Sequence, residues 1–278
     1  MPLRIVQSKQ NGRLKELRSA LAHPGRDERG LAGIEGPNLI EEAVRAGLRM
    51  PTVFWSLETQ DRLETLALPA ETEVLLVPRD LLASVLATET PQPVAAFIEP
   101  PEWTWDHILG GHSDTAPLIV VLAGLQDPGN LGTIVRSAEA FGATGVICLP
   151  GTVSAWNPKA VRASAGSLFR VPMLVASAEE TFERLLEAGV RVFATALLAG
   201  KAVNDADLAA SVALIIGNEG NGVPADIAAQ ASGSLTIPCP GPVESLNAAV
   251  AASVLLYEAS RQRALQGGQH RPPKRGWR

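Results

Sequence analysis

The sequence has 278 residues, of which 46% are hydrophobic, and a formal net charge of −5. A chain of this length and composition can bury a sizeable core, which excludes a disordered protein and fits one large or two modest domains. No stretch has the apolar run of a signal peptide or a membrane span, and Cys148 and Cys239 suggest neither a disulfide framework nor a metal site. We therefore expect a cytoplasmic protein with no membrane partner and no metal.

Positive charge is concentrated at the two ends of the chain. Residues 1–29 hold seven basic and three acidic side chains, and residues 261–278 hold six basic side chains and no acidic one. Such ends either keep a protein soluble or contact the phosphates of a nucleic acid, and the composition leaves both interpretations open.

Residues 1–98 predict a small α/β domain. Helices are expected over 13–21, 35–47 and 79–87, and strands over 52–56 and 73–78. A linker at 99–116 follows, because Pro, Gly and polar residues interrupt the pattern there. Trp103 and Trp105 in this linker could stack on bases, but we favour packing against a domain face.

Residues 117–264 predict a second α/β domain, followed by a basic tail at 265–278. Its strands are expected over 117–125, 145–150, 171–175, 190–197, 212–217 and 235–239, and its helical segments over 130–141, 157–168, 178–189, 204–210, 224–231 and 245–264. Strands that are near-continuous Val, Ile and Leu runs, alternating with helices, predict a parallel sheet covered on both faces. Ligands bind such sheets at the carboxyl ends of the strands, so the loops after Leu125, Ile216 and Ile237 are candidate sites.

The first of these loops leads into a helix. Asn130 suits the N-cap of that helix, and Gly142 suits its end. Arg136 lies one turn beyond Gly132 on the same face, and helical side chains lean toward the N-terminus. We therefore expect space beneath the guanidinium of Arg136, although this loop alone would favour an exposed surface arginine with a flexible-loop glycine.

The second loop carries three glycines, Gly217, Gly220 and Gly222, which allow the backbone to approach a ligand closely. Glu219 lies among them and would repel phosphate while attracting a cation or a hydroxyl. The fingerprints of phosphate and dinucleotide loops are absent from the sequence. A nucleoside with a positive centre therefore fits this loop better than a nucleotide.

The third loop is stiffened by three prolines and opens the last helix, which Ser245 or Asn247 can cap. This helix begins with a run of small residues at 248–253, which allows another element to approach closely. By itself the run indicates only tight packing.

Taken together, the three loops resemble the three motifs of the SpoU/TrmH family of RNA ribose 2′-O-methyltransferases. The matching segments are Asn-x-Gly-x-x-x-Arg at 130–136, Gly-Asn-Glu-Gly-x-Gly at 217–222, and Ile-Pro at 237–238 with Glu-Ser-Leu-Asn at 244–247. The resemblance covers 117 to about 264. Residues 35–47 look like part of the family's accessory RNA-binding domain, and residues 157–172 look like its segment between the first two motifs.

The resemblance implies a trefoil-knotted α/β domain that forms an obligate homodimer, here expected through the small-residue helix. It implies S-adenosyl-L-methionine as cofactor, contacted largely through the backbone at Gly217, Ile237 and Leu246. It also implies Arg136 as the catalytic arginine, acting either as a general base or by stabilising charge, which we favour. The expected catalytic site also includes Asn130, Glu219, Ser245 and Asn247; Asn130 would fix the helix of the arginine, and Ser245 and Asn247 would order the cofactor loop.

The expected reaction is methyl transfer to a ribose 2′-OH of RNA. The N-terminal domain favours rRNA as the substrate over tRNA. A non-catalytic RNA-binding protein of ribosome assembly on the same fold is the alternative from another class. A nucleotide-dependent dehydrogenase is disfavoured, because its fingerprint glycines are missing.

Overall fold

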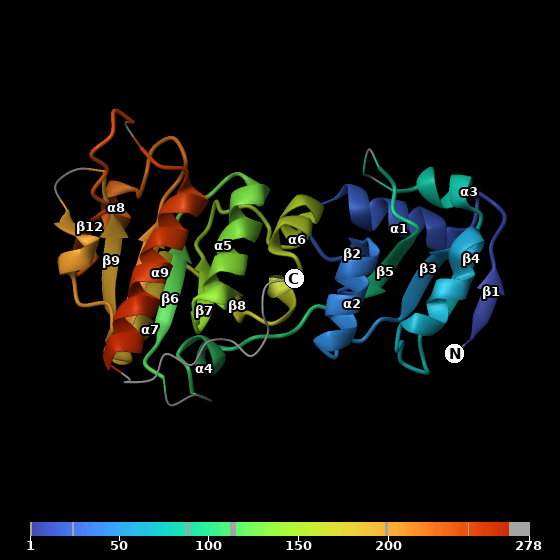
Figure 1. Ribbon diagram of the computed structural model, residues 1–278, viewed down its shortest axis with the longest axis horizontal. Coiled ribbons are helices and arrows are strands. Elements are labelled where there is room, and N and C mark those ends of the chain that lie inside the picture. Colours follow the sequence, from blue (N-terminus) through green and yellow to red (C-terminus); the bar gives the residue numbers. More distant parts are fainter. Residues whose placement is uncertain are drawn as a thin grey trace. The chain divides into compact units, whose positions relative to one another are not determined.

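The computed structural model describes residues 2–23, 25–86, 88, 90–111, 115–197, 200–243 and 245–266. These residues belong to two compact units (Figure 1). The first unit comprises Met1–Glu102, Pro128–Arg136 and Val153–Arg170, and the second comprises Trp103–Asp127, Ser137–Thr152 and Val171–Arg278. Helix α5 (Pro128–Ala140) therefore begins in the first unit and ends in the second.

The first unit contains a mixed five-stranded sheet of order β1-β4-β3-β5-β2. Its strands are β1 (Leu3–Ile5), β2 (Ala32–Glu35), β3 (Thr52–Ser56), β4 (Glu73–Val77) and β5 (Val94–Ile98). Strands β1, β4 and β3 pair in parallel, and β5 pairs antiparallel with β3 and β2. The sequence predicted β3 and β4. It placed Glu35 in a helix, whereas Gly36, with φ 104°, separates β2 from α2 (Pro37–Arg45).

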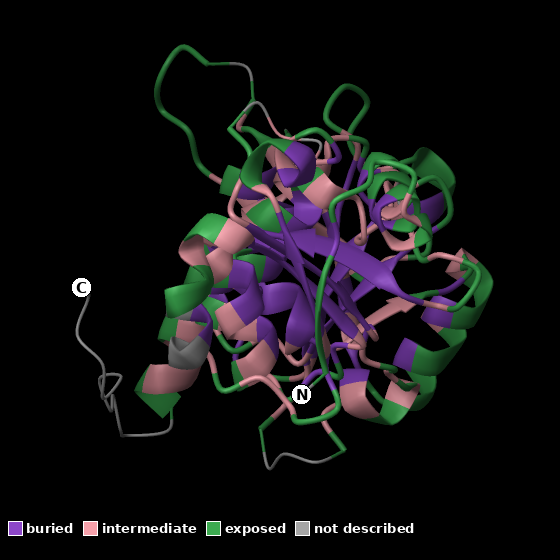
Figure 2. Cartoon of the chain, turned by 90° about the vertical axis from the view of Figure 1, so that its right-hand side faces the viewer, coloured by how far each residue is buried: buried purple, intermediate pink, exposed green. Residues whose placement is uncertain are grey.

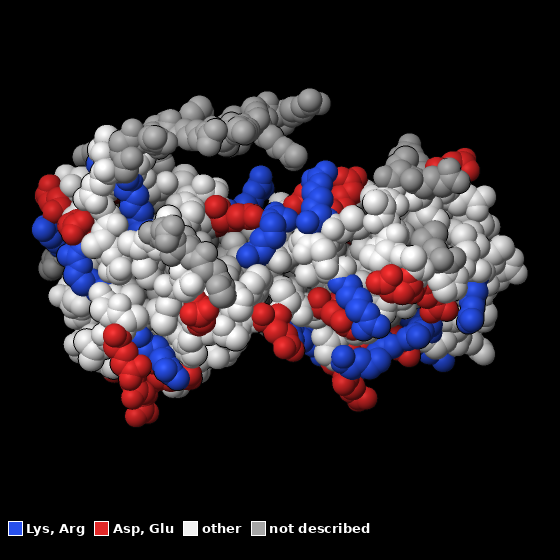
Figure 3. All heavy atoms as spheres, turned by 90° about the horizontal axis from the view of Figure 1, so that it is seen from below, with Lys and Arg blue, Asp and Glu red and all other residues white. Residues whose placement is uncertain are grey.

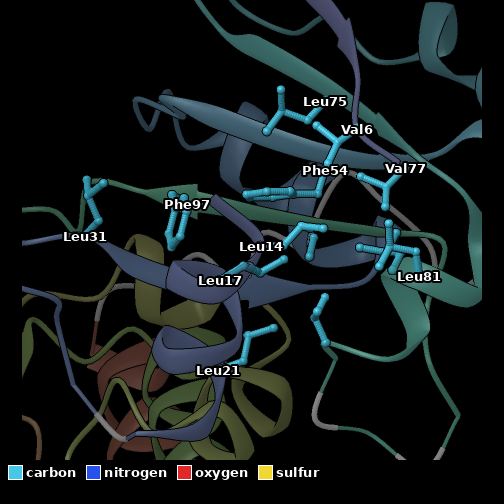
Figure 4. Packing of buried hydrophobic residues seen from close by; sticks show 13 residues of the cluster. Val6, Leu14, Leu17, Leu21, Leu31, Phe54, Leu75, Val77, Leu81 and Phe97 are labelled. Carbon is cyan, nitrogen blue, oxygen red and sulfur yellow. The ribbon is translucent and has the colours of Figure 1, made fainter. Parts of the chain in front are cut away.

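The core of this unit lies between the sheet and helix α1 (Gly12–Ala22). Leu14, Leu17 and Leu21 recur at helical spacing and are buried, so α1 presents one apolar face to the strands. The rings of Phe54 and Phe97 meet edge to face with centroids 5.6 Å apart in the same cluster (Figure 4). The segment η1 (Leu57–Thr65) and helix α3 (Arg79–Ala83) complete the N-terminal part of the unit.

Helices α5 and α6 (Pro158–Ser164) make a close backbone contact at Gly132. A Cβ atom at Gly132 would lie 2.3 Å from the carbonyl oxygen of Ala160 and 2.7 Å from the Cβ of Ala163. The expectation of free space at this glycine is therefore wrong, because α6 fills it. Helix α6 is also shorter than predicted, since Ala165 and Gly166 adopt left-handed conformations ahead of η2 (Ser167–Phe169).

The second unit is built on a seven-stranded sheet of order β10-β12-β9-β11-β6-β7-β8, in which all the pairings are parallel, as predicted. The strands are β6 (Leu118–Leu122), β7 (Gly145–Cys148), β8 (Met173–Val175), β9 (Arg191–Thr195), β10 (Lys201–Ala202), β11 (Val212–Ile216) and β12 (Gly233–Thr236). Every residue of β6 and β11 is buried. Figure 2 shows how the buried residues concentrate on the strands and on the inner sides of the helices.

The helical segments of the second unit are α4 (Trp105–Ile108), α7 (Ala178–Glu187), η3 (Val203–Asp205), α8 (Ala225–Ala228) and α9 (Ala248–Gln266). Trp105 packs against the core of this unit, and its indole Nε1 donates to Glu180 at 2.9 Å. Trp103 meets the ring of His107 edge to face at 5.3 Å. Both tryptophans thus have packing partners in their own unit, in agreement with the role that we favoured.

Two arginines near the C-terminal end of α9 are held by hydrogen bonds within the chain. Both belong to the basic segment 261–278. Arg261 forms two hydrogen bonds of 2.7 Å with Glu258. Arg263 donates to the carbonyl oxygens of Pro117 (2.9 Å), Ala210 (2.8 Å), Leu208 (3.3 Å) and Ala116. Burial lowers the pKa of Arg263. Both guanidinium groups are thus engaged within the chain, and the remaining basic residues of this end, 271–278, lie outside the described residues.

Many basic side chains near the N-terminus are also paired with acidic ones. Arg4 lies 3.5 Å from Glu73, Arg13 lies 3.3 Å from Glu16, and Arg29 lies 2.8 Å from Asp27. Figure 3 shows basic and acidic side chains next to one another on one face of the chain. The charge available for phosphate contact is therefore smaller than the sequence count suggests.

Candidate active site

A cavity of about 750 Å³ lies in the second unit, where strands β9, β11 and β12 end. Its walls are residues 194–197 at the end of β9, residues 216–223 from the end of β11 onward, residue 228 of α8, residues 234–239, 243, 245 and 246 from the end of β12 onward, and residues 248, 251 and 255 of α9. This volume is in the range of small-molecule sites. The cavity therefore forms at the edge of the sheet that the sequence predicted.

The loop after β11 fits only a glycine at position 217. A Cβ atom there would lie 2.0 Å from the carbonyl carbon of Gly222 and 2.2 Å from the nitrogen of Val223. The backbone groups of Asn218 and Gly222 exchange two hydrogen bonds of 2.9 Å, and the Oδ1 of Asn218 accepts from the N–H of Gly220. The result is a tight turn that presents its backbone to the cavity.

Glu219 joins this loop to the loop after β6. Its carboxylate accepts the backbone N–H groups of Gln126 (3.1 Å) and Asp127 (3.0 Å), directly before α5. Asn218 strengthens the same connection, because its Nδ2 donates to the carbonyl oxygen of Gly124 at 2.9 Å. Glu219 thus lines the cavity and also positions the first motif loop, a role that the sequence analysis missed.

Replacing Glu219 by Gln should destabilise the cofactor-free protein, because the amide can accept one of the two N–H groups but not both. For an exposed group, we expect a loss of about 1 kcal/mol, or about 2 to 4 °C in Tm, in thermal denaturation without ligand. Glu187→Gln is the matched control, since Glu187 is an exposed carboxylate on α7 with a single 3.7 Å ion pair. Equal Tm values for Glu219→Gln and wild type would show that the two hydrogen bonds do not hold the loop.

The loop after β12 supplies the remaining predicted residues of the second unit. Ile237, Ser245 and Leu246 line the cavity. Asn247 caps α9, because its Oδ1 accepts from the backbone N–H groups of Ala249 (2.9 Å) and Val250 (3.3 Å). Of the two capping candidates, Asn247 is therefore the one used.

Asn130 and Arg136 lie on the part of α5 that belongs to the first unit, and neither lines the cavity. The helix begins at Pro128, so Asn130 lies in its first turn and the prediction that it is the N-cap is wrong. Proline is common at the first helical position, where no hydrogen-bonded N–H is needed. Arg136 is exposed, and within the described ranges its guanidinium has neither an ion pair nor a hydrogen bond.

The end of β9 is a part of the cavity wall that the sequence analysis missed. Residues 194–197 line the cavity, and the hydroxyl of Thr236 donates to the carbonyl oxygen of Leu197 at 3.1 Å. Strand β9 lies between β11 and β12 in the sheet. The strand itself was predicted, and knowledge of the strand order would have placed its end in the site.

The cavity has the properties that a nucleoside with a positive centre requires. Apolar side chains of Ile216, Leu235 and Leu255 form part of its wall, and the turn at Gly217 offers backbone groups at close range. The carboxylate of Glu219 provides the negative charge. These residues fit S-adenosyl-L-methionine, with its adenosine and its sulfonium.

Neither cysteine nor an acidic cluster offers a different chemistry in the described part of the chain. Burial raises the pKa of the Cys148 thiol to about 12, and Cys148 and Cys239 are both free. The described residues hold no group of three or more His, Cys, Asp or Glu side chains placed for a metal ion. Among them, no helix has the length and apolarity needed to cross a membrane.

A parallel sheet with a glycine-lined cavity at the carboxyl ends of its strands is consistent with an α/β methyltransferase. Residues 117–257 match the SpoU rRNA Methylase family, and residues 11–96 match the MRM3-like substrate binding domain. The chain belongs to the SpoU rRNA methylase family. It is 32% identical, over 92% of its length and 98% of the relative, to the 23S rRNA (guanosine(2553)-2′-O)-methyltransferase RlmP of Bacillus subtilis.

Solved structures agree with this assignment. The AdoMet-bound rRNA methyltransferase from Sinorhizobium meliloti superposes with a TM-score of 0.81 at 31% identity, covering 93% of this chain and 98% of that one. The SpoU methyltransferase AviRb from Streptomyces viridochromogenes, in complex with AdoMet, superposes with a TM-score of 0.78 at 30% identity, covering 91% and 98%.

The family resemblance, the fold class, the enzyme class and the cofactor predicted from the sequence are thus confirmed. The trefoil knot is implied by membership of the family. The domain boundaries at residues 98 and 116 and the roles of the individual site residues stay predictions.

Proposed function

We propose that this protein transfers a methyl group from S-adenosyl-L-methionine to a ribose 2′-OH of rRNA in the cytoplasm. The observation that carries the proposal is the cavity beside Gly217, where only a glycine fits and where the second and third motif loops meet. The rRNA substrate is supported by the rRNA methyltransferase relatives and by the match of residues 11–96 to a substrate binding domain.

Residues of the second unit would bind the cofactor. The bound cofactor supplies a methyl group on a positively charged sulfur. Gly217, Ile237 and Leu246 would contact it largely through their backbone groups, and Ser245 would order the loop that covers it. Asn247 contributes by starting α9 at the cavity wall. The task of these residues is positioning, because an in-line transfer depends on near-attack geometry.

Arg136 would act on the RNA. Arginine side chains carry a positive charge in proteins at neutral pH. The planar guanidinium would bind a phosphate next to the target ribose and stabilise the alkoxide that develops at the 2′ oxygen. Asn130, in the first turn of the same helix, would hold the arginine's helix in place. The exposure of Arg136 and its lack of a partner in the described chain support this role.

We further propose a homodimer through α9, the helix that carries the small-residue run. Within the small-residue run, Ala249 and Ala252 are buried inside the monomer, whereas Ala248, Ala251 and Ser253 are partly exposed. Val250 and Tyr257, two turns apart on the same face of α9, are exposed at 49% and 55%. An exposed apolar stripe on a long helix is suited to meeting its copy.

Replacing both Val250 and Tyr257 by Asp should convert the dimer into a monomer. Each lost apolar contact removes roughly 1.5 to 3 kcal/mol per subunit, and the new charges oppose burial, so we expect at least a hundredfold rise in the dimer Kd. Analytical ultracentrifugation at micromolar concentration measures it. Leu186→Asp on α7, where the leucine is 81% exposed, is the control. A wild-type monomer with full methyl transfer would overturn the dimer proposal.

Two measurements test the proposed function. Isothermal titration should show binding of S-adenosyl-L-methionine to the folded protein, and no detectable binding at millimolar ligand would refute the enzyme. Mapping of 2′-O-methyl groups in RNA from cells with and without the protein should then reveal a mark lost from rRNA. Loss of a mark from tRNA instead would reassign the substrate.

A further inference from the structure

A stack of three side chains in the first unit ends in an exposed arginine. Phe169 is buried, the ring of Trp156 lies nearly parallel to it, at 13° with centroids 6.4 Å apart, and the guanidinium of Arg26 lies 6.0 Å from the centroid of the Trp156 ring. The stack therefore leads from the interior of the unit to its surface.

Local hydrogen bonds hold the backbone segments of Trp156 and Arg26 in place. The N–H groups of Trp156 and Asn157 donate to the Oγ and the carbonyl oxygen of Ser154, which makes a turn directly before α6. In the loop of Arg26, the Oδ1 of Asp27 accepts the N–H groups of Arg29 and Leu31, each at 2.9 Å. Neither position is a free loop tip.

Arg26 differs in its charge environment from the paired arginines near the N-terminus. Arg4, Arg13 and Arg29 each have a carboxylate partner within 4 Å, whereas within the described residues Arg26 has none. The outer face of its guanidinium is therefore free for a ligand. Lys159 and Arg162, both exposed, add positive charge on α6, the helix that follows Trp156.

We propose that Arg26, supported by Trp156, is a stacking platform for an unpaired base of the RNA substrate. Proteins that recognise single-stranded RNA stack its bases on aromatic rings and on arginine planes, and an arginine whose guanidinium lies over a tryptophan ring offers such a plane. The two residues fall in different matched segments, Arg26 in the substrate binding domain and Trp156 in the methylase domain. This inference rests on the proposed function, because it requires RNA as the substrate.

The test is binding of the full chain to unmodified 23S rRNA transcribed in vitro. Arg26→Gln should weaken the affinity about tenfold, the effect of losing one stacked base, and Arg26→Lys should fail to restore it, because lysine keeps the charge but lacks the plane. Trp156→Leu should cause a similar loss by removing the support of Arg26. Arg4→Gln is the control, with the same change in charge at an arginine that is 73% exposed and paired.

The possible outcomes separate this inference from the proposed function. All variants should bind S-adenosyl-L-methionine as wild type does, which shows that they are folded. If Arg26→Gln binds the rRNA no more weakly than Arg4→Gln, or if Arg26→Lys restores the affinity, the stacking platform is refuted while the methyltransferase stands. If the wild-type chain binds the cofactor but no RNA, the proposed function fails and the platform with it.

Discussion

Replacing Arg136 by Ala should abolish methyl transfer while the affinity for S-adenosyl-L-methionine stays within about twofold of wild type. Removal of one preorganised charged donor costs about a hundredfold to a thousandfold in rate, and Arg136 is proposed to bind both the phosphate and the developing alkoxide, so we expect the upper end of that range. The cofactor should be unaffected, because Arg136 does not line the cavity. Single-turnover transfer of a labelled methyl group and isothermal titration measure the two quantities.

Arg136→Lys distinguishes geometry from charge. Lysine keeps the positive charge but loses the planar fork that holds two oxygens at once, so we expect a loss close to that of Arg136→Ala. Arg184→Ala on α7 removes an exposed guanidinium from the second unit and should leave transfer unchanged. If Arg136→Lys retains most of the activity, the arginine acts as a point charge and the geometric argument is wrong.

Gly217→Ala should weaken cofactor binding severely. The new methyl group would collide with backbone atoms of Gly222 and Val223 at 2.0 to 2.3 Å, and backbone cannot move aside as a flexible side chain can. The loop must then open, which displaces the groups that face the cavity. We expect the Kd for S-adenosyl-L-methionine to rise at least about a hundredfold, which corresponds to about 2.8 kcal/mol.

Gly220→Ala in the same loop is the matched control. The Cβ of this residue would meet only the Oδ1 of Asn218 at 3.5 Å, an ordinary contact, and Gly220 does not have a left-handed φ. Its Kd should stay within about twofold of wild type. Unchanged binding by Gly217→Ala would mean that the loop can rearrange at little cost and that the turn does not define the site.

The sequence predicted the strands whose own residues have a high strand propensity. In the second unit, β6, β7 and β11 are rich in Val, Ile and Leu and were predicted, whereas the two-residue edge strand β10 (Lys201–Ala202) was missed. In the first unit, β1, β2 and β5 were missed. The segments "AGIE" and "VAAFI" contain Ala and Gly, which have low strand propensity, and they are ordered by pairing of β5 with β2 and β3.

The candidate site was predicted where function depends on local chemistry and missed where it depends on long-range contacts. The close-approach glycine at 217 and the cap at Asn247 could be read from single segments. The filling of Gly132 by α6, the two N–H partners of Glu219 and the end of β9 in the cavity wall require the tertiary arrangement. No local pattern contains these contacts.

Arg263 of α9 holds the segment just before β6, so this part of the second unit can form only after α9 has been synthesised. Its guanidinium binds carbonyl oxygens at Ala116 and Pro117, just before β6, although the arginine follows Ala116 by 147 positions. Until α9 has been synthesised, these carbonyls lack their partner, and α9 cannot yet cover β11. Helix α9 follows every strand of the sheet in the chain, so nascent chains that stop before α9 should lack the cavity, one wall of which is α9.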